Sequence, residues 1–465
     1  ITVESTAQLQ YAASGIVAFA GNGDAMADNS GSVNAIGAYW ATGIDVRGFG
    51  DATVENSGSV YANGGKYAFG VYATAGTGDV SVTNADGGEI GFYSYSGRGW
   101  GVFAYANNGD VNVTNDGTIS GYAYGQSAGI FGRAGLGDVN VTNTGSIEVI
   151  SGGNVAVGVF ARADYGTATV NNSGDIYAGV EGVNGYIGYA AYGILARGEY
   201  VDVSNSGDIV AIGSAYATGI LATSYYGTTV TNTGGSIYAA ASGVLVSIPY
   251  NIYYAGSAIG IDASSAYGDV AVSNASDITA LSLYVDATGI SAVGPLDTVV
   301  TNSGDIDAAS LYAYATGISA SGAYVVVSNS GAIIAESDST AATGILANAT
   351  HDATVTTSTT SDIAVSGGGI VRGIGVRSQN GDVTVSNAGD IAVIGSSYFF
   401  DATGIHGYAS NGDVSISSSG DISAYSIGFA RGVFASGASA SIVNSGSVDA
   451  TSAQWIAYGL YANGS

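Results

Sequence analysis

The sequence contains no cysteine, and among its 465 residues there are only two prolines and nine basic residues. Without cysteine the chain can form no disulfide framework, no thiolate zinc site and no cysteine nucleophile. So few lysines and arginines can neutralise few phosphates, which argues against nucleic acid or anionic membranes as partners. No apolar run reaches the roughly 18 residues of a transmembrane helix. We therefore expect no nucleic-acid partner and no membrane insertion by this segment.

What the chain has in quantity is glycine, tyrosine and acidic residues: 75 Gly, 33 Tyr and 36 Asp and Glu, for a net charge of −27. The hydrophobic fraction of 46% is too high, and the charged fraction of 10% too low, for a disordered chain. Glycine follows no three-residue period, which excludes collagen. The chain begins at Ile1 without an initiator methionine or a signal peptide, so we expect a processed chain or one segment of a longer protein.

A motif V-x-V-x-N recurs along the whole chain, as in the segment 110–131, at intervals of 26 to 33 residues with one interval of 42. Thr357 and Ser418 stand at the anchor position in two repeats. Such a period is typical of a repeat protein and not of several globular domains. The anchor asparagines are Asn29, Asn56, Asn84, Asn115, Asn143, Asn172, Asn205, Asn232, Asn274, Asn302, Asn329, Asn387 and Asn444.

Each repeat contains three short segments with alternating apolar and polar residues, separated by Gly, Asn and Ser, which indicates three strands and three turns. The predicted fold is therefore all-β: a right-handed parallel β-helix (β-solenoid) of about fifteen coils, each with three short strands in about 28 residues. One coil cannot bury its inward face, but stacked coils share a core. We expect residues 1–465 to form one continuous solenoid, an elongated rod, in which the anchor asparagines stack as a hydrogen-bonded ladder.

The repeat G-D-V-x-V-T-N-S-G-D-I-x-A, followed by A-T-G-I-x-A, resembles the passenger repeats of Gram-negative autotransporters and, more loosely, filamentous-haemagglutinin-type adhesins. The resemblance covers nearly the whole chain. It implies a right-handed parallel β-helix that is secreted to the outer cell surface or the extracellular space. It specifies the architecture well and the ligand poorly.

Aspartate occupies the position five residues before the anchor in ten of the fifteen repeats, and a second aspartate column follows the anchor by three residues. Asp closes turns by accepting backbone N–H groups. Stacked carboxylates also repel one another, so Ca²⁺ between them is the alternative. The cofactor expectation is therefore none, or Ca²⁺ at Asp24, Asp51, Asp79, Asp110 and Asp138. The other members are Asp269, Asp297, Asp352, Asp382 and Asp413, and the second column includes Asp175, Asp208, Asp305, Asp390 and Asp421.

An arginine column lies four residues after the glycine of the third segment and precedes the acidic turn. We expect ion pairs with Asp51, Asp138 and Asp382, with contact to an anionic sugar as the alternative. The column consists of Arg47, Arg133, Arg162, Arg197 and Arg377.

Aromatic residues gather just before the third segment, where they could stack on one another, form an interface between copies, or contact glycans. The predicted stripe comprises Tyr39, Trp40, Tyr93, Tyr95, Tyr122, Tyr124, Tyr216, Tyr284, Tyr312, Tyr314 and Tyr398. The 42-residue interval contains an insertion at 244–258, interpreted as a protruding loop or a partial extra coil. Its candidate binding residues are Pro249, Tyr250, Tyr253 and Tyr254.

We expect no enzyme, because His351 and His406 have no repeated partners and the carboxylates belong to the repeat itself. Two functions remain: a structural subunit that polymerises head-to-tail into a fibre or biofilm matrix, and a monomeric adhesin stalk that binds glycans. The first is suggested by the two ends, since the segment 461–465 followed by 1–5 resembles the internal segment 105–115. The expected partners are therefore copies of the chain or surface glycans.

Overall fold

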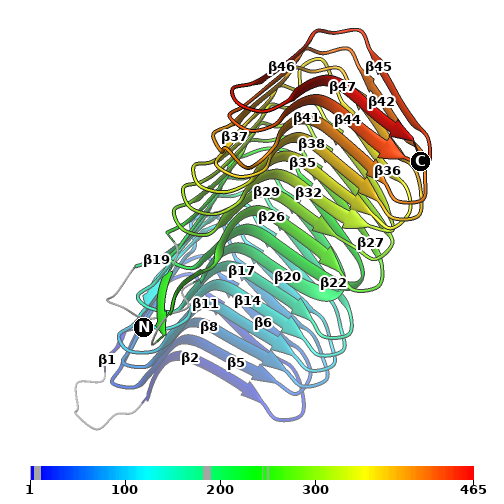
Figure 1. The fold of residues 1–465 in the computed structure, drawn as a ribbon. Coiled ribbons are helices and arrows are strands. Elements are labelled where there is room, and N and C mark those ends of the chain that lie inside the picture. Colours follow the sequence, from blue (N-terminus) through cyan, green and yellow to red (C-terminus); the bar gives the residue numbers. More distant parts are fainter. Residues whose placement is uncertain (1, 5–11, 182–189, 243, 249–250, 465) are drawn as a thin grey trace. The chain divides into compact units, whose positions relative to one another are not determined.

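The computed structural model describes residues 2–4, 12–181, 190–242, 244–248 and 251–464. Strands are the only regular elements among them, and they wind into the stacked coils of a β-solenoid, about fifteen in the chain (Figure 1). This confirms the predicted all-β fold with three strands in each coil of about 28 residues. Two units, Ile1–Val230 and Thr231–Ser465, are described separately.

In the first unit each coil has a first strand that ends at the anchor asparagine, then a second and a third strand. The first strands are β3 Ala25–Asn29, β6 Ala52–Asn56, β9 Val80–Asn84, β12 Val111–Asn115, β15 Val139–Asn143 and β18 Thr167–Asn172. The second strands are β1 Thr2–Glu4, β4 Ser32–Gly37, β7 Ser59–Gly64, β10 Glu89–Ser94, β13 Thr118–Ala123, β16 Ser146–Ser151, β19 Ile176–Val180 and β21 Ile209–Gly213. The third strands are β2 Ala12–Ala20, β5 Trp40–Gly48, β8 Tyr67–Ala75, β11 Arg98–Ala106, β14 Ser127–Ala134, β17 Val155–Ala163 and β20 Ala190–Asn205, which continues into the next first strand.

The second unit repeats this order, and β22 Tyr216–Asn232 contains the boundary between the units. Its first strands are β27 Asp269–Asn274, β30 Asp297–Asn302, β33 Tyr324–Asn329, β36 Ala353–Thr357, β39 Val383–Asn387, β42 Val414–Ser418 and β45 Ala440–Asn444. Its second strands are β23 Ile237–Ala241, β28 Ile278–Ser282, β31 Ile306–Ser310, β34 Ile333–Ser337, β37 Ile363–Gly367, β40 Ile391–Gly395, β43 Ile422–Ser426 and β46 Val448–Ser452. Its third strands are β26 Ser257–Ser265, β29 Asp286–Val293, β32 Ala315–Gly322, β35 Ala342–Ala349, β38 Val371–Ser378, β41 Ala402–Ala409, β44 Ala430–Gly437 and β47 Ala457–Gly464.

Strands of successive coils pair in parallel and in register, so that equivalent residues form columns. Val111 of β12, for example, pairs with Val80 of β9 and with Val139 of β15. Because strand side chains alternate between faces, one set of columns is buried and the other is outside. In the same coil Val111, Ile119 and Ala134 are fully buried. The core is thus a set of Val, Ile and Ala columns shared by neighbouring coils, as repeat proteins require.

A glycine interrupts the alternation in the middle of each third strand. At Gly101 an added Cβ would lie 2.3 Å from Cγ2 of Ile119 and 2.6 Å from the carbonyl oxygen of Gly129. Only glycine fits there, and the paired register passes over this residue. The outward residues on the two sides of the glycine then approach each other: in β8 the rings of Phe69 and Tyr72 meet edge to face with centroids 5.2 Å apart. The third strand is therefore bent, with its outer side concave.

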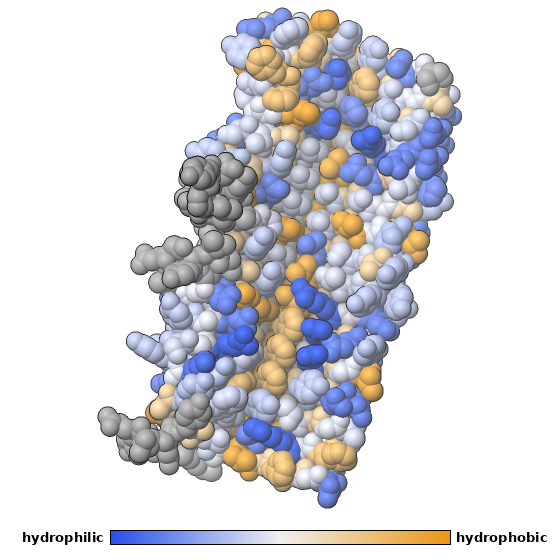
Figure 2. Space-filling model, turned by 60° about the horizontal axis from the view of Figure 1, so that its bottom comes forward, coloured by the Kyte–Doolittle hydropathy of each residue, from blue (hydrophilic) through white to orange (hydrophobic). Residues whose placement is uncertain are grey.

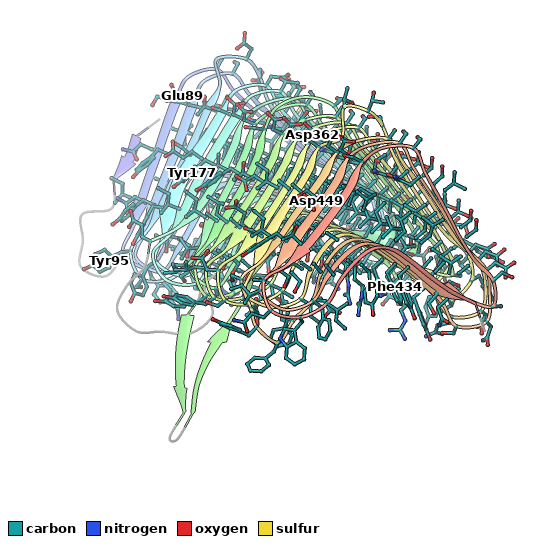
Figure 3. All side chains as sticks on the ribbon, turned by 45° about the horizontal axis from the view of Figure 1, so that its top comes forward. Glu89, Tyr95, Tyr177, Asp362, Phe434 and Asp449 are labelled. Carbon is teal, nitrogen blue, oxygen red and sulfur yellow. The ribbon has the colours of Figure 1, made fainter. Side chains whose placement is uncertain are left out.

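The insertion in the second unit contains an antiparallel pair of strands, β24 Val244–Ile248 and β25 Asn251–Ala255. In register, Val244 faces Ala255 and Ile248 faces Asn251. This hairpin extends away from the coils (Figure 3). It is the one antiparallel pairing in the part of the chain that the structure describes.

Candidate binding face on the third strands

Three outward columns on the third strands form what we call the third-strand face. The columns stand one residue before, two residues after and four residues after the bending glycine, and register aligns them from coil to coil. From β5 to β20 of the first unit, the column before the glycine is Thr42, Phe69, Trp100, Ala128, Val157 and Tyr192. Over the same strands the column two residues after the glycine is Asp45, Tyr72, Phe103, Phe131, Phe160 and Leu195. The column four residues after it is Arg47, Thr74, Tyr105, Arg133, Arg162 and Arg197.

The middle column of the first unit is an aromatic ladder. Ring centroids lie 5.0 Å apart from Tyr72 to Phe103, 4.9 Å from Phe103 to Phe131 and 4.9 Å from Phe131 to Phe160, with interplanar angles of 3°, 3° and 22°. Each such pair contributes about 0.5–1.5 kcal/mol beyond the burial of its area. The ring faces are used by this stacking, so the ladder presents ring edges outward. Edges carry the positive end of the aromatic quadrupole.

In the column before the glycine, the aromatic stack ends at Trp100. Phe69 covers one face of its indole, with centroids 4.7 Å apart and planes inclined by 13°. The next residues in this column are Ala128 and Val157, which are too small to continue the stack. A groove of about 640 Å³ occupies the space, and Trp100, Ala128, Val157 and Phe160 line it. In Figure 2 a column of hydrophobic residues with strongly hydrophilic residues beside it runs along the face in view.

Arginines line the same groove: Arg98 at the start of β11, Arg133 on β14 and Arg197 on β20. Arg133 and Arg162 share the carboxylate of Asp164, at 2.7 and 2.6 Å. Burial acts to raise the pKa of Asp164, but hydrogen bonds from both arginines lower it below its ordinary value. Within the described residues Arg98 and Arg197 have no carboxylate at ion-pair distance. Their guanidinium groups remain available to a ligand.

The positive charges of this strongly acidic chain lie on third strands or directly beside one. All eight arginines lie on third strands of one unit or the other, and the single lysine, Lys66, directly precedes β8. The chain as a whole carries a net charge of −27. Local fields of opposite sign to the rest of a surface select ligands by charge. The third-strand face therefore favours anionic groups.

The predicted ion pairs of the arginine column with Asp51, Asp138 and Asp382 are wrong. Arg47 binds Asp45, two residues earlier on the same outward side of β5, with Nε 2.7 Å from Oδ1. Arg133 binds Asp164, which comes from the following coil. The cause is that the acidic turn uses its carboxylates for backbone hydrogen bonds, whereas the arginines lie over the concave strand.

The anchor asparagines lie in a row within each unit. In the first unit each amide nitrogen donates to the amide oxygen of the next asparagine, at 2.7–2.8 Å from Asn29 as far as Asn205. In the second unit the row runs from Asn232 to Asn329 at 2.7 Å. Asn329 then donates to Ser361, while the Thr357 hydroxyl donates to Asn387. Asn444 donates to the carbonyl of Gly446.

The aspartate columns form hydrogen bonds between coils. The carboxylate of Asp24 accepts from the backbone N–H of Asp51 at 2.9 Å, and the same bond links Asp51, Asp79, Asp110 and Asp138 in turn, at 2.8–2.9 Å. The second column does the same, as when Asp421 accepts from Ser447 N–H, which lowers the pKa of Asp421. A backbone amide dipole thus lies between successive carboxylates. Among the described residues no group of three His, Cys, Asp or Glu side chains is placed to hold a metal.

Among the described residues, members of the predicted aromatic stripe stack on one another at two places. Tyr93 stacks on Tyr122 with centroids 5.4 Å apart, and Tyr284 on Tyr312 at 5.1 Å. Trp40 stacks on Phe69 at 5.2 Å. Tyr39 meets the ring of Tyr67 edge-on at 5.8 Å. Several others are exposed: Tyr95 (labelled in Figure 3), Tyr124, Tyr216, Tyr314 and Tyr398.

For the candidate binding residues of the insertion, the structure describes no side-chain contacts. Pro249 and Tyr250 lie outside the described residues. Tyr253 and Tyr254 lie on β25, where the structure describes the backbone. Of the two histidines, His351 stacks on Tyr324 at 5.1 Å and His406 on Phe434 at 4.9 Å. Phe434 lies on the third-strand face of the second unit (Figure 3).

The aromatic ladder and the groove were not predicted from the sequence. The signal was present: an aromatic residue directly follows Gly-Val or Gly-Ile in four successive repeats, at Tyr72, Phe103, Phe131 and Phe160. The alternation of strand side chains places this residue on the outer face, so packing in the core does not explain why an aromatic residue recurs there.

No family model, no curated protein and no solved structure matches this chain. Within the described residues there is also no helix long and apolar enough to cross a membrane.

Proposed function

We propose that the chain is a non-catalytic adhesive β-solenoid at the outer surface of a Gram-negative cell, and that it binds carbohydrate through the third-strand face of its first unit. The surface location is supported by the resemblance of the repeats to autotransporter passengers. The observation that carries the binding proposal is the indole of Trp100, stacked on Phe69 on one side and facing the small residue Ala128 on the other.

An aromatic face beside a groove suits a sugar ring, because it offers a large, rigid apolar area to the ring's C–H groups. The floor of the groove is apolar and well packed: Ala128, Val157 and Leu195 are 5%, 8% and 6% exposed. Its volume of about 640 Å³ lies within the usual range of small-molecule sites. The free guanidinium groups of Arg98 and Arg197 supply donors for hydroxyl or acidic oxygens at the rim.

The test is binding of the purified chain to a panel of neutral and acidic polysaccharides, followed by calorimetry with the best oligosaccharide. Ala128→Phe continues the column of Phe69 and Trp100 and fills the groove, so we expect binding to fall at least about tenfold, or 1.4 kcal/mol. Thr316→Phe makes the equivalent change in a coil of the second unit and serves as the control. Unchanged affinity in Ala128→Phe would contradict the proposed site.

As the second candidate we propose a structural role in which copies join end to end. β47 pairs in parallel and in register with β44, and a strand of another copy could pair in the same way. Exposed strand edges invite such addition. Electron microscopy over a range of concentrations tests this role: filaments that lengthen with concentration support it, and particles of one length oppose it.

A further inference from the structure

A second hollow interrupts the third-strand face of the second unit. There the column two residues after the bending glycine reads Leu346, Gly375, His406, Phe434 and Tyr461. His406, Phe434 and Tyr461 stack, with centroids 4.9 and 5.4 Å apart. Gly375 has no side chain to continue the column. The result is a pocket of about 310 Å³ beside the histidine.

The glycine leaves space that other residues would fill. A Cβ at Gly375 would stand 3.3 Å from Cδ of Arg372 and 3.6 Å from Cδ1 of Leu346, so a larger side chain would project into the pocket. The walls are supplied by three successive third strands: Leu346 and Asn348 on β35, Arg372 and Arg377 on β38, and His406 and Tyr408 on β41.

Two arginines of β38 face this pocket, three residues before and two residues after Gly375. Neither has a carboxylate at ion-pair distance in the described part of the chain, whereas Arg431 on the nearby β44 binds Asp401 at 2.7 Å. Arg377 lies over the ring of Tyr408, 5.4 Å from its centroid. Burial, the largest influence, lowers the pKa of Arg372 despite the attraction of Asp401. A half-buried cation without a bonded anion is costly, and an oxyanion in the pocket would offset that cost.

We propose that this pocket binds an oxyanion, the carboxylate or sulfate group of a ligand no larger than about one sugar unit, held between Arg372 and Arg377. Among the described residues that line the pocket, none is acidic. Guanidinium groups match the geometry of carboxylate and sulfate oxygens, and His406 and Asn348 border the same space. This inference does not depend on carbohydrate binding by the first unit.

The two histidines of the chain make the test direct, because one borders the pocket and the other does not. The ring signals of His406 and His351 would be followed by NMR while sodium sulfate or sodium glucuronate is added at constant ionic strength. We expect saturable shifts at His406 and none at His351. Glucose, which lacks the anionic group, should leave both unchanged.

Three variants of the pocket and one control variant test the assignment further. Arg372→Gln and Arg377→Gln should each weaken the response of His406 about tenfold or more, since each removes a charge-assisted contact. Gly375→Leu should abolish it by filling the pocket. Arg47→Gln, with the same charge change in the first unit, should leave it intact.

Sodium acetate is titrated in the same way, and tighter binding of glucuronate than of acetate supports the site and assigns part of the affinity to the sugar ring. Binding of sulfate alone supports the site with an inorganic or ester sulfate as ligand. Shifts that do not saturate, that occur equally at His351, or that persist in the double variant Arg372→Gln/Arg377→Gln would overturn the proposal.

Discussion

Each buried anchor asparagine uses both ends of its amide. Asn115 donates to Asn143 and accepts from Asn84, both at 2.7 Å, and also donates to the carbonyl of Gly117 at 3.2 Å. One residue type thereby satisfies its own polar atoms and closes a turn in coil after coil. A buried polar atom left without a partner costs about 1–3 kcal/mol.

Replacing Asn115 by alanine should therefore destabilise the protein by about 2–4 kcal/mol, because Asn84 and Asn143 each lose a partner. Asn115→Thr should cost less, since Thr357 already donates to Asn387 at 2.6 Å in the second unit. Urea unfolding followed by circular dichroism measures this. The control is Asn112→Ala, on the exposed side of the same strand, and an equal loss there would contradict the role of the row.

His406 should make stability depend on pH. Burial, then the charges of Arg372 and Arg431, lower its pKa to about 4 from the ordinary 6.5. Between these values the unfolded chain binds more protons than the folded one, so stability falls as the pH is lowered from 6.5 to 4. At about 1.4 kcal/mol per pKa unit, the free energy of unfolding falls by roughly 3 kcal/mol over this range.

Carboxylates also titrate in this range, so the measurement is the difference between wild type and His406→Phe, in which the ring stack on Phe434 is kept. The variant should lose less stability between pH 6.5 and 4. Identical pH profiles for the two proteins would show that His406 is not buried in this way.

Among the elements, the third strand differs from the other two because a glycine bends it and makes its outer side concave. The concavity brings the outward columns together and creates both the ladder and the groove. First and second strands follow plain alternation, as the buried Val111 and Ile119 illustrate. The candidate sites of both units accordingly lie on third strands.

Gly101→Ala should destabilise the protein by more than about 3 kcal/mol, since its Cβ would overlap Ile119 and the backbone of Gly129. Gly23→Ala is the matched control, because nothing lies within 4 Å of a Cβ there. Thermal melts of the two variants compare them, and equal melting temperatures would contradict the argument for the bend.

The turns that contain the aspartate columns should be stable without a bound metal ion. Their carboxylates already accept backbone N–H groups of the next coil, as Asp79 does from Asp110 at 2.8 Å. We expect the melting temperature to be the same with a chelator and with millimolar Ca²⁺. A rise with Ca²⁺ that Asp79→Asn and Asp110→Asn reduce would instead support cation binding at this column.

At the scale of the whole chain, the repeat could be predicted from the sequence, but the places where small residues interrupt its outward columns could not. The V-x-V-x-N repeat predicts the coil, the three strands and the row that contains Asn115. The groove depends on Ala128 standing in register with Trp100, 28 residues earlier, and the pocket on Gly375 in register with His406. Those relations require the alignment of third strands. The ion pair of Arg133 with Asp164 also joins two successive coils. The sequence alone therefore favoured an aspartate of the nearer acidic turn as the partner of Arg133.

Charge is also distributed by this periodicity. The acidic residues of the repeat occupy turns and outer faces in most coils, while all the arginines lie on the concave third strands. A ligand that carries negative charge would be repelled by most of the surface and attracted to one face of each unit. An acidic carbohydrate would combine the apolar ring that we propose for the groove of the first unit with the oxyanion that we propose for the pocket of the second.

The most direct measurement of the central claim uses the three tryptophans. In the double variant Trp40→Phe/Trp455→Phe, Trp100 is the only indole, and its fluorescence reports on the groove. Titration with the oligosaccharide selected from the panel should shift its emission to shorter wavelength, with the same saturation that calorimetry gives. Binding by calorimetry with an unchanged Trp100 spectrum would place the carbohydrate elsewhere and contradict the account.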